Sequence, residues 1–384
     1  MQPRVYFDHN ATTPLADDVL EVFTSALRDL PGNASSIHQF GQIARQKLEQ
    51  ARRQIATMLN ATQKEIVLLS GGTEASNLAL FGTVAPGAHV ITTAIEHPAV
   101  LSPCEKLRES GVEITVAPPL RDGLVDPDAI RASLRKNTAL VSVMHANNET
   151  GVIQPISAIA AIAREAGALL HVDGVQAAGK IAVDVQTLGA DLYSISAHKL
   201  YAPKGVGALF VRNGVKLHPQ VFGGRHERER RAGTENVPGA VAFGAAAEWA
   251  SKHSSNEAQR IAALRDRLEQ QVLDNVPDVA RNGNPEQRLP NTSNLRFDGI
   301  SGESMVIALD LRGFAVSSGS ACSSGSVEPS HVLLAMGLSP DEARSSVRIS
   351  LGRGNNEAQV DALAAAIAES AAHLRRVSPV YSHV

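Results

Sequence analysis

Residues that could carry acid–base or covalent chemistry follow predicted strands at several points of the chain. Lys199 comes soon after the strand-like run 192–195, and a lysine enclosed in a pocket can form a Schiff base with an aldehyde. Asp173 follows the apolar run 168–172, where a carboxylate could keep a heterocyclic nitrogen protonated. His97 follows another such run and could stack on a ligand or transfer a proton. Taken singly, each residue also fits a structural role.

A candidate anion site lies at residues 70–74 (SGGTE), which follow the strand-like run 66–69 and open a predicted helix. Gly71 and Gly72 let the backbone approach a ligand, and Thr73 could cap the helix. Free N–H groups and the positive end of the helix dipole would then favour an anion. The segment is neither a GxGxxG nor a Walker loop, so a nucleotide is not implied. By itself it fits a plain helix cap better than a binding site.

Two residues in the C-terminal part could act on a substrate. Arg348 lies in the strand-like segment 346–351, where an arginine needs an anion, either a substrate carboxylate or an acidic side chain on the sheet. Cys322 lies among the small residues of 317–326 (SSGSACSSGS), where a thiol is a candidate nucleophile or an incidental cysteine. With the phosphate cradle, the ring-nitrogen acid, the histidine and the lysine, these are the parts of a pyridoxal phosphate site. The sequence has no CxxC, HExxH or GxSxG motif, so metal-dependent and serine hydrolysis have no support.

The elements that must position these residues are strands alternating with helices. Strand-like runs lie at 66–69, 88–93, 112–117, 138–143, 168–172, 192–196 and 206–211, and helical patterns at 73–82, 98–110, 126–135, 156–165 and 235–273. This alternation implies βαβ units and a largely parallel sheet with both faces covered. Ligands of such sheets bind beyond the carboxyl ends of the strands, where the residues above would meet. The polar segment 277–290 is interpreted as the boundary before a smaller C-terminal domain.

The composition of the 384-residue chain excludes several classes of protein. Its formal net charge is −3 and 4% of its residues are aromatic, which argues against nucleic acid, since phosphate binding needs a basic excess and single strands need stacking platforms. Cys104 and Cys322 are too few for a disulfide scaffold, and Cys104 lies in an apolar helical pattern typical of packing. Residues 1–15 lack an apolar signal core, and no run reaches the about 18 apolar residues of a membrane span. We therefore expect a soluble cytoplasmic protein.

Over nearly its whole length the sequence resembles the cysteine desulfurases, members of the class V aminotransferase group of fold-type I pyridoxal phosphate enzymes. The resemblance is carried by YFDHNATTP (6–14), NASSIHQFG (33–41), SGGTEASNLAL (70–80), EHPAVL (96–101), HANNETG (145–151), HVDGVQAAGK (171–180), SAHKLYAPKGVGAL (196–209), RRAGTEN (230–236), SSGSACSSGS (317–326) and VRISLGR (347–353). The segment around Cys322 resembles the group associated with iron–sulfur cluster assembly, and RRAGTEN is closer to the nitrogen-fixation type. The resemblance implies an α/β fold with two domains. These are a mostly parallel, cofactor-binding large domain, 12–255, and a smaller α/β domain, 1–11 plus 256–384, that carries the cysteine loop.

The resemblance also implies how the cofactor ring would be held. Lys199 would form the Schiff base, Asp173 would pair with the pyridine nitrogen, and Gln176 would hydrogen-bond the ring hydroxyl. His97 would lie over the face of the ring. These residues match the family's motifs one by one, so their roles are expectations carried over by position.

Further roles follow for the phosphate and the substrate. The phosphate would be held by four residues of one subunit, Gly72, Thr73, Ser196 and His198. Thr234 would reach the phosphate of the other subunit, so a homodimer with shared sites is expected. Asn148 and Arg348 would bind the substrate carboxylate, and Asn148 would also touch the cofactor.

The reaction implied by the resemblance removes sulfur from L-cysteine. Lys199 would take the Cα proton, with His97 as a second acid or base, and the Cys322 thiolate would attack the substrate sulfur. The products would be L-alanine and a persulfide that passes to an iron–sulfur scaffold or other acceptor protein, and Cys322 could ligate iron transiently. The alternatives are a selenocysteine lyase, which would work without the thiol, and an ordinary class V aminotransferase, which would need a keto acid. A sulfur carrier or scaffold-binding protein with a vestigial site is a third.

Overall fold

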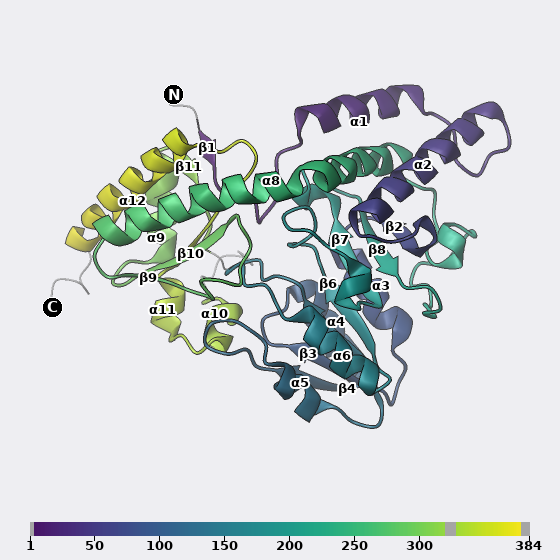
Figure 1. The fold of residues 1–384 in the computed structure, drawn as a ribbon, viewed down its shortest axis with the longest axis horizontal. Helices are drawn as coiled ribbons and strands as arrows, with labels where there is room; N and C mark the ends of the chain where they lie inside the picture. The colour runs from purple at the N-terminus through teal and green to yellow at the C-terminus, as the bar shows by residue number, and fades with distance from the viewer. Residues whose placement is uncertain (1–3, 319–327, 378–384) are drawn as a thin grey trace.

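The computed structural model describes residues 4–318 and 328–377, and Figure 1 shows two groups of strands, the larger of which is the sheet that contains β2 to β8. The strands of this sheet are β2 (Ile66–Leu69), β3 (His89–Thr93), β4 (Glu113–Ala117), β5 (Thr138–Met144), β6 (Leu169–Asp173), β7 (Leu192–Ser196) and β8 (Gly207–Val211). They lie in the order β2-β8-β7-β6-β5-β3-β4. Among these strands β8 alone runs in the opposite direction, so its pairings with β2 and β7 are antiparallel and the other pairings are parallel. The prediction of a largely parallel sheet is therefore confirmed.

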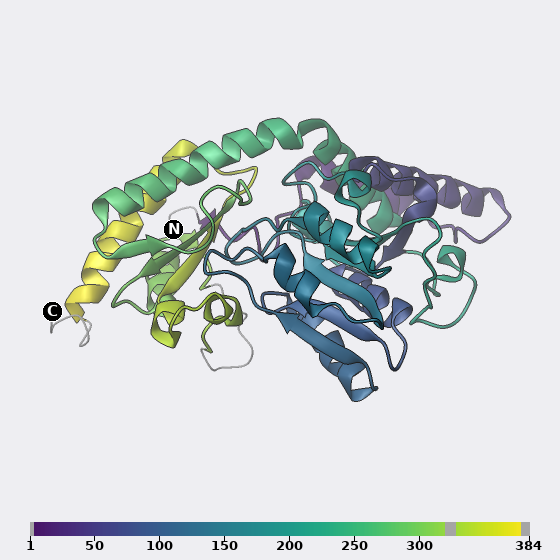
Figure 2. The same ribbon diagram turned by 60° about the horizontal axis from the view of Figure 1, so that its bottom comes forward.

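Helices cover both faces of this sheet (Figure 2). Their bounds are α1 (Asp17–Asp29), α2 (Gln39–Met58), α3 (Gly72–Thr83), α4 (Pro98–Glu109), α5 (Pro127–Ser133), α6 (Ile156–Glu165) and α7 (Val185–Leu188). On one face, Leu140 and Leu192 pack with residues of α3 and α4. On the other face, their neighbours Val141 and Tyr193 pack with α2 and α6. Because successive side chains of a strand point to opposite faces, both faces must be apolar, which explains the near-continuous apolar strands.

A smaller antiparallel sheet lies at the other end of the molecule. It consists of β9 (Val279–Arg281), β10 (Thr292–Phe297) and β12 (Ser346–Ser350), in the order β12-β10-β9. Nearby are β1 (Val5–Tyr6), paired with β11 (Phe314–Ala315), and α9 (Gly302–Leu311), α10 (His331–Ala335), α11 (Pro340–Arg344) and α12 (Glu357–Val377). The interpretation of 277–290 as a boundary is wrong, since β9 lies inside it and belongs to this sheet. A strand this short, flanked by Asn, Gly and Pro, leaves no alternating pattern to detect.

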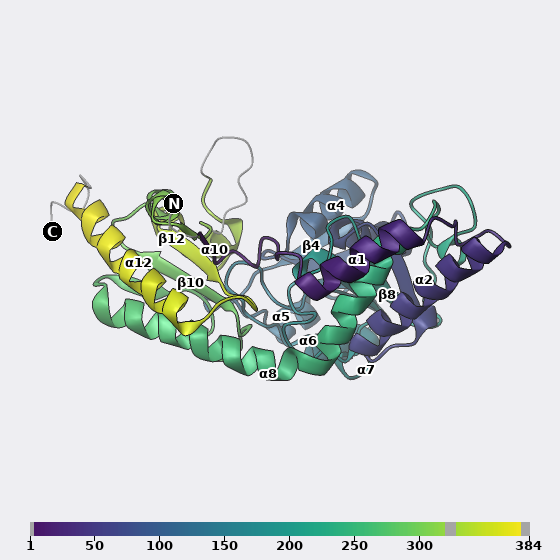
Figure 3. The ribbon, with the colours of Figure 1, turned by 90° about the horizontal axis from the view of Figure 1, so that it is seen from above.

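The long helix α8 (Val237–Asn275) passes both sheets, as the view from above shows (Figure 3). Its residues up to Ala250 pack in the core of the larger sheet, and those from Ile261 onward pack in the core of the smaller one. Phe7 packs in the second core as well. We propose that the chain divides at residue 255, inside α8, with residues 1–11 joining the smaller part. Neither α8 nor any other helix within 4–318 and 328–377 is long and apolar enough to cross a membrane.

A strained turn between β8 and α8 is held by a buried ion pair. Glu227, Arg228 and Glu229 have φ values of 46°, 56° and 66°, a left-handed conformation that costs non-glycine residues about 1–2 kcal/mol each. The Glu227 carboxylate accepts hydrogen bonds from both terminal nitrogens of Arg52, at 2.6 and 2.8 Å. It also accepts one from the Leu68 N–H at 2.8 Å, which pairs a backbone donor on β2. These contacts offset the strain and fix the segment that leads to the RRAGTEN motif.

The first prediction concerns this ion pair. Glu227→Ala should lower the free energy of unfolding by about 3–5 kcal/mol, because the buried Arg52 guanidinium loses the carboxylate that bonds both terminal nitrogens. Arg52 then keeps only Glu49, at Nε, as an acidic partner, and the Leu68 N–H loses its acceptor. Chemical denaturation measures the change. Glu109→Ala is the control, since Glu109 pairs with Lys106 on the surface, and it should change stability by about 0.5 kcal/mol or less. Equal effects of the two variants would contradict the role given to Glu227.

Candidate active site

A cavity of about 640 Å³ lies where the carboxyl ends of β5, β6 and β7 face the smaller sheet. The sequence-predicted residues that line it are Gly72, Thr73, His97, Asn148, Asp173, Gln176, Ser196, His198, Lys199 and Arg348. The strand-end rule explains this convergence for Asp173 and Lys199, because Asp173 ends β6 and Lys199 follows β7. Arg348 comes instead from β12 of the smaller sheet, so the cavity joins both parts of the molecule.

The anion cradle at the start of α3 has the space and the free donors that an anion needs. Gly71 is the N-cap residue and the helix has no side-chain cap, so the prediction that Thr73 caps it is wrong. Thr73 lies inside the first turn, because the chain enters the helix at Gly71 and Gly72 instead. A Cβ on Gly72 would lie 2.6 Å from Cγ2 of Val175 and 3.5 Å from Cβ of Ser196. Glycine at this position therefore keeps the approach to the helix N-terminus open.

Asp173 presents a buried carboxylate at the floor of the cavity. Its Oδ1 accepts a hydrogen bond from the Val175 N–H at 3.0 Å. Burial raises the pKa of Asp173 to about 6, although the nearby Lys199 acts in the opposite direction. The carboxylate is therefore mostly ionised at neutral pH, and it can keep a basic ring nitrogen protonated.

The side-chain amine of Lys199 lies at the cavity, where burial disfavours its protonated form. Its Nζ donates to the main-chain oxygens of Asn10 and Ala11 at 2.5 and 2.6 Å. Burial lowers the pKa of Lys199 to about 8, and the Arg348 guanidinium lowers it further, while Asp8 and Asp173 act in the opposite direction. A sizeable fraction of the amine is therefore unprotonated near neutral pH, as a nucleophile or a proton acceptor requires.

The two histidines of the site are held neutral. His97 is the N-cap of α4, and its Nδ1 accepts from the Ala99 N–H at 3.0 Å. Burial is the largest cause that lowers the pKa of His97, so its proton must lie on Nε2. Burial also lowers the pKa of His198 to about 4, and its Nδ1 is 3.1 Å from Oγ1 of Thr12.

Arg348 has an acidic partner inside the protein as well as a face on the cavity. One terminal nitrogen donates to Oδ1 of Asp8 at 2.7 Å, and the other donates to the Asn148 main-chain oxygen at 3.1 Å. Its Nε is buried and makes no hydrogen bond. The sequence left open whether the anion is a substrate carboxylate or an acidic side chain. The ion pair with Asp8 supplies an acidic side chain, and a substrate carboxylate stays open as a further partner because Arg348 also lines the cavity.

Two residues of the expected site are not brought to this cavity. Thr234 is exposed in the segment before α8 and does not line it. Cys322 lies outside the described residues, although Ser317 and Glu328, on either side of the segment 319–327, do line the cavity. Cys104 is buried on α4, and burial raises the pKa of its thiol to about 12, which agrees with the expected packing role.

The structure adds residues that the sequence reasoning did not single out. Asn10 is buried and contacts Lys199, and its signal was its place inside the YFDHNATTP segment. Glu149 is buried and accepts from the Ser330 hydroxyl, and burial raises its pKa to about 7. His331 donates from Nε2 to the Glu96 main-chain oxygen at 2.9 Å. Within the described residues no group of His, Cys, Asp or Glu could hold a metal ion.

Comparison with known proteins gives the family. The model of the family described as aminotransferase class-V matches residues 5–363. A protein of Dictyoglomus turgidum named cysteine desulfurase IscS is 45% identical over 383 residues, which cover 99% of this chain and 97% of the relative. A solved structure titled NifS-like protein superposes with a TM-score of 0.91 at 36% identity, covering 97% of this chain and 100% of the other. Another, titled SspA in complex with cysteine, has a TM-score of 0.81 at 36% identity, covering 90% and 98%. The chain belongs to the class-V aminotransferase family and, within it, to the cysteine desulfurases.

Proposed function

We propose that the protein removes the sulfur of L-cysteine, giving L-alanine and a persulfide on Cys322. The observation that carries the proposal is the convergence of Lys199, Asp173 and the cradle at Gly72 on one cavity. The protein is a pyridoxal phosphate enzyme, as its family is. The test is to supply the cofactor and L-cysteine and to measure alanine and sulfide. A requirement for a keto acid would favour an ordinary aminotransferase instead.

The residues of the cavity fit pyridoxal phosphate. The open helix N-terminus at Gly72 suits the phosphate, the ionised Asp173 suits a protonated ring nitrogen, and Lys199 offers an amine of lowered pKa to the aldehyde. The other residues proposed to hold the cofactor are Thr73, His97, Asn148, Gln176, Ser196 and His198. When bound, the cofactor supplies an electron sink that stabilises negative charge at the carbons of the substrate.

The chain's own groups supply the proton transfers. Lys199 is proposed to take the Cα proton of the substrate, which its pKa of about 8 favours near neutral pH. His97 is proposed as the second acid or base. In its neutral form it offers a hydrogen-bond donor at Nε2, and it can transfer a proton once Nδ1 releases the Ala99 N–H and the ring becomes protonated. Asp173 stays ionised and buried throughout, so the positive charge on the ring nitrogen persists.

Cys322 is proposed to accept the sulfur. Its thiolate attacks the substrate sulfur, a sulfur–sulfur bond forms as the carbon–sulfur bond of cysteine breaks, and the carbon takes a proton to give alanine. Support comes from the described residues that flank 319–327, since Ser317 and Glu328 both line the cavity.

Arg348 is proposed to bind the substrate carboxylate together with Asn148. Arg348→Ala should raise KM for L-cysteine at least about tenfold, because a charge-assisted hydrogen bond to a carboxylate contributes about 1.5–3 kcal/mol. Steady-state kinetics with L-cysteine measure the change. The control is Arg344→Ala, which removes an exposed arginine and should leave KM unchanged. Arg353 is unsuitable as a control because it stacks on Trp249. An unchanged KM for Arg348→Ala would mean that other residues bind the substrate carboxylate.

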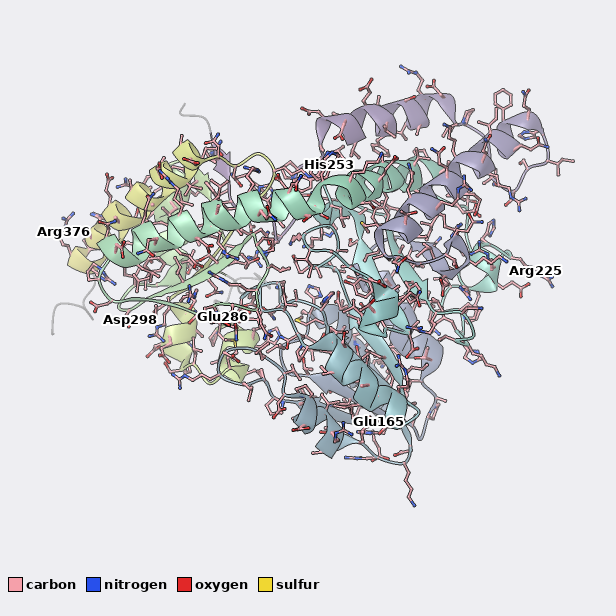
Figure 4. All side chains as sticks on the ribbon, viewed as in Figure 1. Glu165, Arg225, His253, Glu286, Asp298 and Arg376 are labelled. Carbon is pink, nitrogen blue, oxygen red and sulfur yellow. The ribbon has the colours of Figure 1, made fainter. Side chains whose placement is uncertain are left out.

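A homodimer with shared sites is part of the proposal. Thr234 is exposed and outside its own cavity, as a residue that reaches a second subunit must be. Ile37 and Phe222 are 92% and 82% exposed, and we propose that they belong to the surface that the second subunit covers. Phe222 precedes Arg225, which Figure 4 labels at the end of the molecule far from Arg376. A second copy of the chain is the proposed occupant of this surface.

Complementation tests the shared site. Thr234→Ala and Lys199→Ala should each lower sulfide production on their own. Coexpressed, they should give more activity than the two separate variants together, because a mixed dimer contains one cavity with Lys199 from one chain and Thr234 from the other. Size-exclusion chromatography with light scattering checks that the dimers form. Absence of complementation in a mixed dimer would refute the shared site.

The last part of the proposal concerns the protein that receives the sulfur from Cys322. We propose that the persulfide passes in the cytoplasm to an acceptor protein, such as an iron–sulfur scaffold, and that Cys322 ligates iron transiently during this transfer. Support comes from the resemblance of 317–326 to the group associated with iron–sulfur assembly. Radiolabelled sulfur from cysteine should appear on a purified scaffold protein with the parent enzyme. Its equal appearance with Cys322→Ala would contradict the transfer route.

A further inference from the structure

Lys180 is a second lysine next to the candidate active site, and the chemistry described above does not use it. Its Nζ donates to Oε1 of Gln176 at 2.5 Å and to Oδ1 of Asn10 at 2.8 Å. Burial lowers its pKa well below the ordinary value for lysine, and the charges of Lys199 and Arg348 act in the same direction. Burying an amine costs free energy, and hydrogen bonds such as these two offset that cost.

The first consequence of Lys180 is the orientation of the Gln176 amide. The Nζ group of Lys180 carries N–H donors, and the Gln176 atom that faces it in the structure is the carbonyl oxygen, Oε1. The Nε2 group of Gln176 is thereby turned the other way, where it donates to the Asn10 main-chain oxygen at 2.9 Å. The same oxygen accepts from Nζ of Lys199 at 2.5 Å. Lys180 thus determines which end of Gln176 lies beside the amine of Lys199.

The second consequence is the orientation of the Asn10 amide. Its Oδ1 accepts from Lys180 and, at 3.0 Å, from Nδ2 of Asn291. The Nδ2 group of Asn10 therefore faces away and donates to the Asn148 main-chain oxygen at 3.1 Å and to Oγ1 of Thr292 at 2.9 Å. Asn10 is 1% exposed, so these partners satisfy a side chain that is almost completely buried. One amine fixes two amides that together connect the N-terminal segment, the cavity wall and the smaller sheet.

We propose that Lys180 is a positioning residue that fixes the amides of Gln176 and Asn10 so that the NH2 group of Gln176 is presented to the cofactor. The inference rests on the proposed function, in which Gln176 donates to the ring hydroxyl of pyridoxal phosphate. Without Lys180 the Gln176 amide keeps only the hydrogen bond from Nε2 to the Asn10 main-chain oxygen, so it turns over more easily. It then presents an oxygen to the ring hydroxyl oxygen, and the hydrogen bond is lost.

A double-mutant cycle on the cofactor-loaded protein tests the proposal. A hydrogen bond donated to an oxygen lowers the affinity of that oxygen for a proton. Lys180→Met should therefore raise the pH midpoint of the visible absorbance change by about one unit. Gln176→Leu should raise it similarly, and adding Lys180→Met to Gln176→Leu should produce no further shift, because no amide remains to be oriented. Lys180→Arg retains donors and should stay near the parent midpoint.

Controls separate this role from a purely structural one. Lys106→Met removes an exposed lysine of α4 and should leave the midpoint unchanged. If Lys180→Met does not fold, Lys180→Gln replaces it in the same cycle, since its shorter chain and single NH2 group cannot reach both acceptors. An unchanged midpoint, or a shift that adds fully to that of Gln176→Leu, would overturn the proposal. Failure of the proposed function is distinguishable, because the parent protein would then take up no pyridoxal phosphate and show no visible band.

Discussion

Lys199→Ala is expected to stay colourless after incubation with pyridoxal phosphate and to lose sulfide production from L-cysteine at least about 10³-fold. Among the described residues that line the cavity, Lys199 is the one lysine. Its removal therefore takes away both the amine that the aldehyde needs and the proposed acceptor of the Cα proton. The visible absorbance spectrum and a sulfide assay measure the two losses separately.

The lowered pKa of Lys199 indicates how the charge of this residue affects the stability of the folded protein. The folded protein lowers the pKa of Lys199 from 10.5 to about 8, so at neutral pH it disfavours the protonated amine that the unfolded chain carries. This penalty is full below pH 8 and disappears as the pH rises above the unfolded value. Removing the amine should relieve this penalty, and the melting temperatures of both proteins at pH 7 show whether loss of activity is due to unfolding.

Chemical rescue provides the sharpest control for Lys199. A small primary amine added to the Lys199→Ala variant should restore part of the turnover, because it can replace the missing proton acceptor. Lys199→Arg should remain inactive, since a guanidinium keeps its proton and forms no bond to the aldehyde. Lys180 should not substitute, because its Nζ is held by Asn10 and Gln176. Full turnover in the alanine variant without added amine would disprove the role of Lys199.

The part of the site that lies on the larger sheet could be predicted from the sequence for a simple geometric reason. The carboxyl ends of parallel strands meet at one edge of a sheet, so Asp173 at the end of β6 and Lys199 after β7 had to lie close together. The apolar runs that mark these strands are strong signals, because both faces of the sheet are buried. His97 and Gly72 follow β3 and β2 by the same logic.

The rest of the site depends on contacts that no local pattern encodes. Arg348 meets Asp8 across 340 residues of sequence, and this pairing exists only because the smaller sheet places β12 beside the N-terminal segment. Asn10 lies 170 residues from Lys180, and its role follows from side-chain hydrogen bonds, which leave no periodicity in the sequence. The family resemblance covered the segment that contains Asn10 and yet assigned it no role, because motif matching carries over only roles that are already known.

The structural differences from the sequence-based expectations also have local causes. Thr73 looked like a helix cap because threonine is common at that position, but the two preceding glycines already turn the chain into α3. A glycine at the N-cap leaves the first N–H groups of the helix without a side-chain acceptor. The two glycines therefore explain both why Thr73 is not the cap and why the N-terminus of α3 is open to an anion.

Cys322→Ala should remain yellow with pyridoxal phosphate and still change its spectrum when L-cysteine is added, yet lose alanine and sulfide production at least about 10³-fold. The cavity residues that bind cofactor and substrate are intact in this variant, and the missing thiolate alone prevents the carbon–sulfur bond from being cleaved. Amino-acid analysis of alanine and intact-mass analysis of the protein measure the two sides of the reaction. The parent should gain the mass of one sulfur atom, located on the peptide that contains residue 322.

Cys104 provides the matched control, because the chain contains two cysteines and only these two thiols can be compared. Burial raises the pKa of Cys104 to about 12 and leaves its side chain almost without solvent contact, so its thiolate is scarce and out of reach of a substrate. Cys104→Ala should therefore keep both turnover and the added sulfur, apart from any loss of stability. Sulfur found on Cys104, or undiminished alanine production by Cys322→Ala, would mean that the sulfur leaves cysteine by another route, as in the lyase alternative.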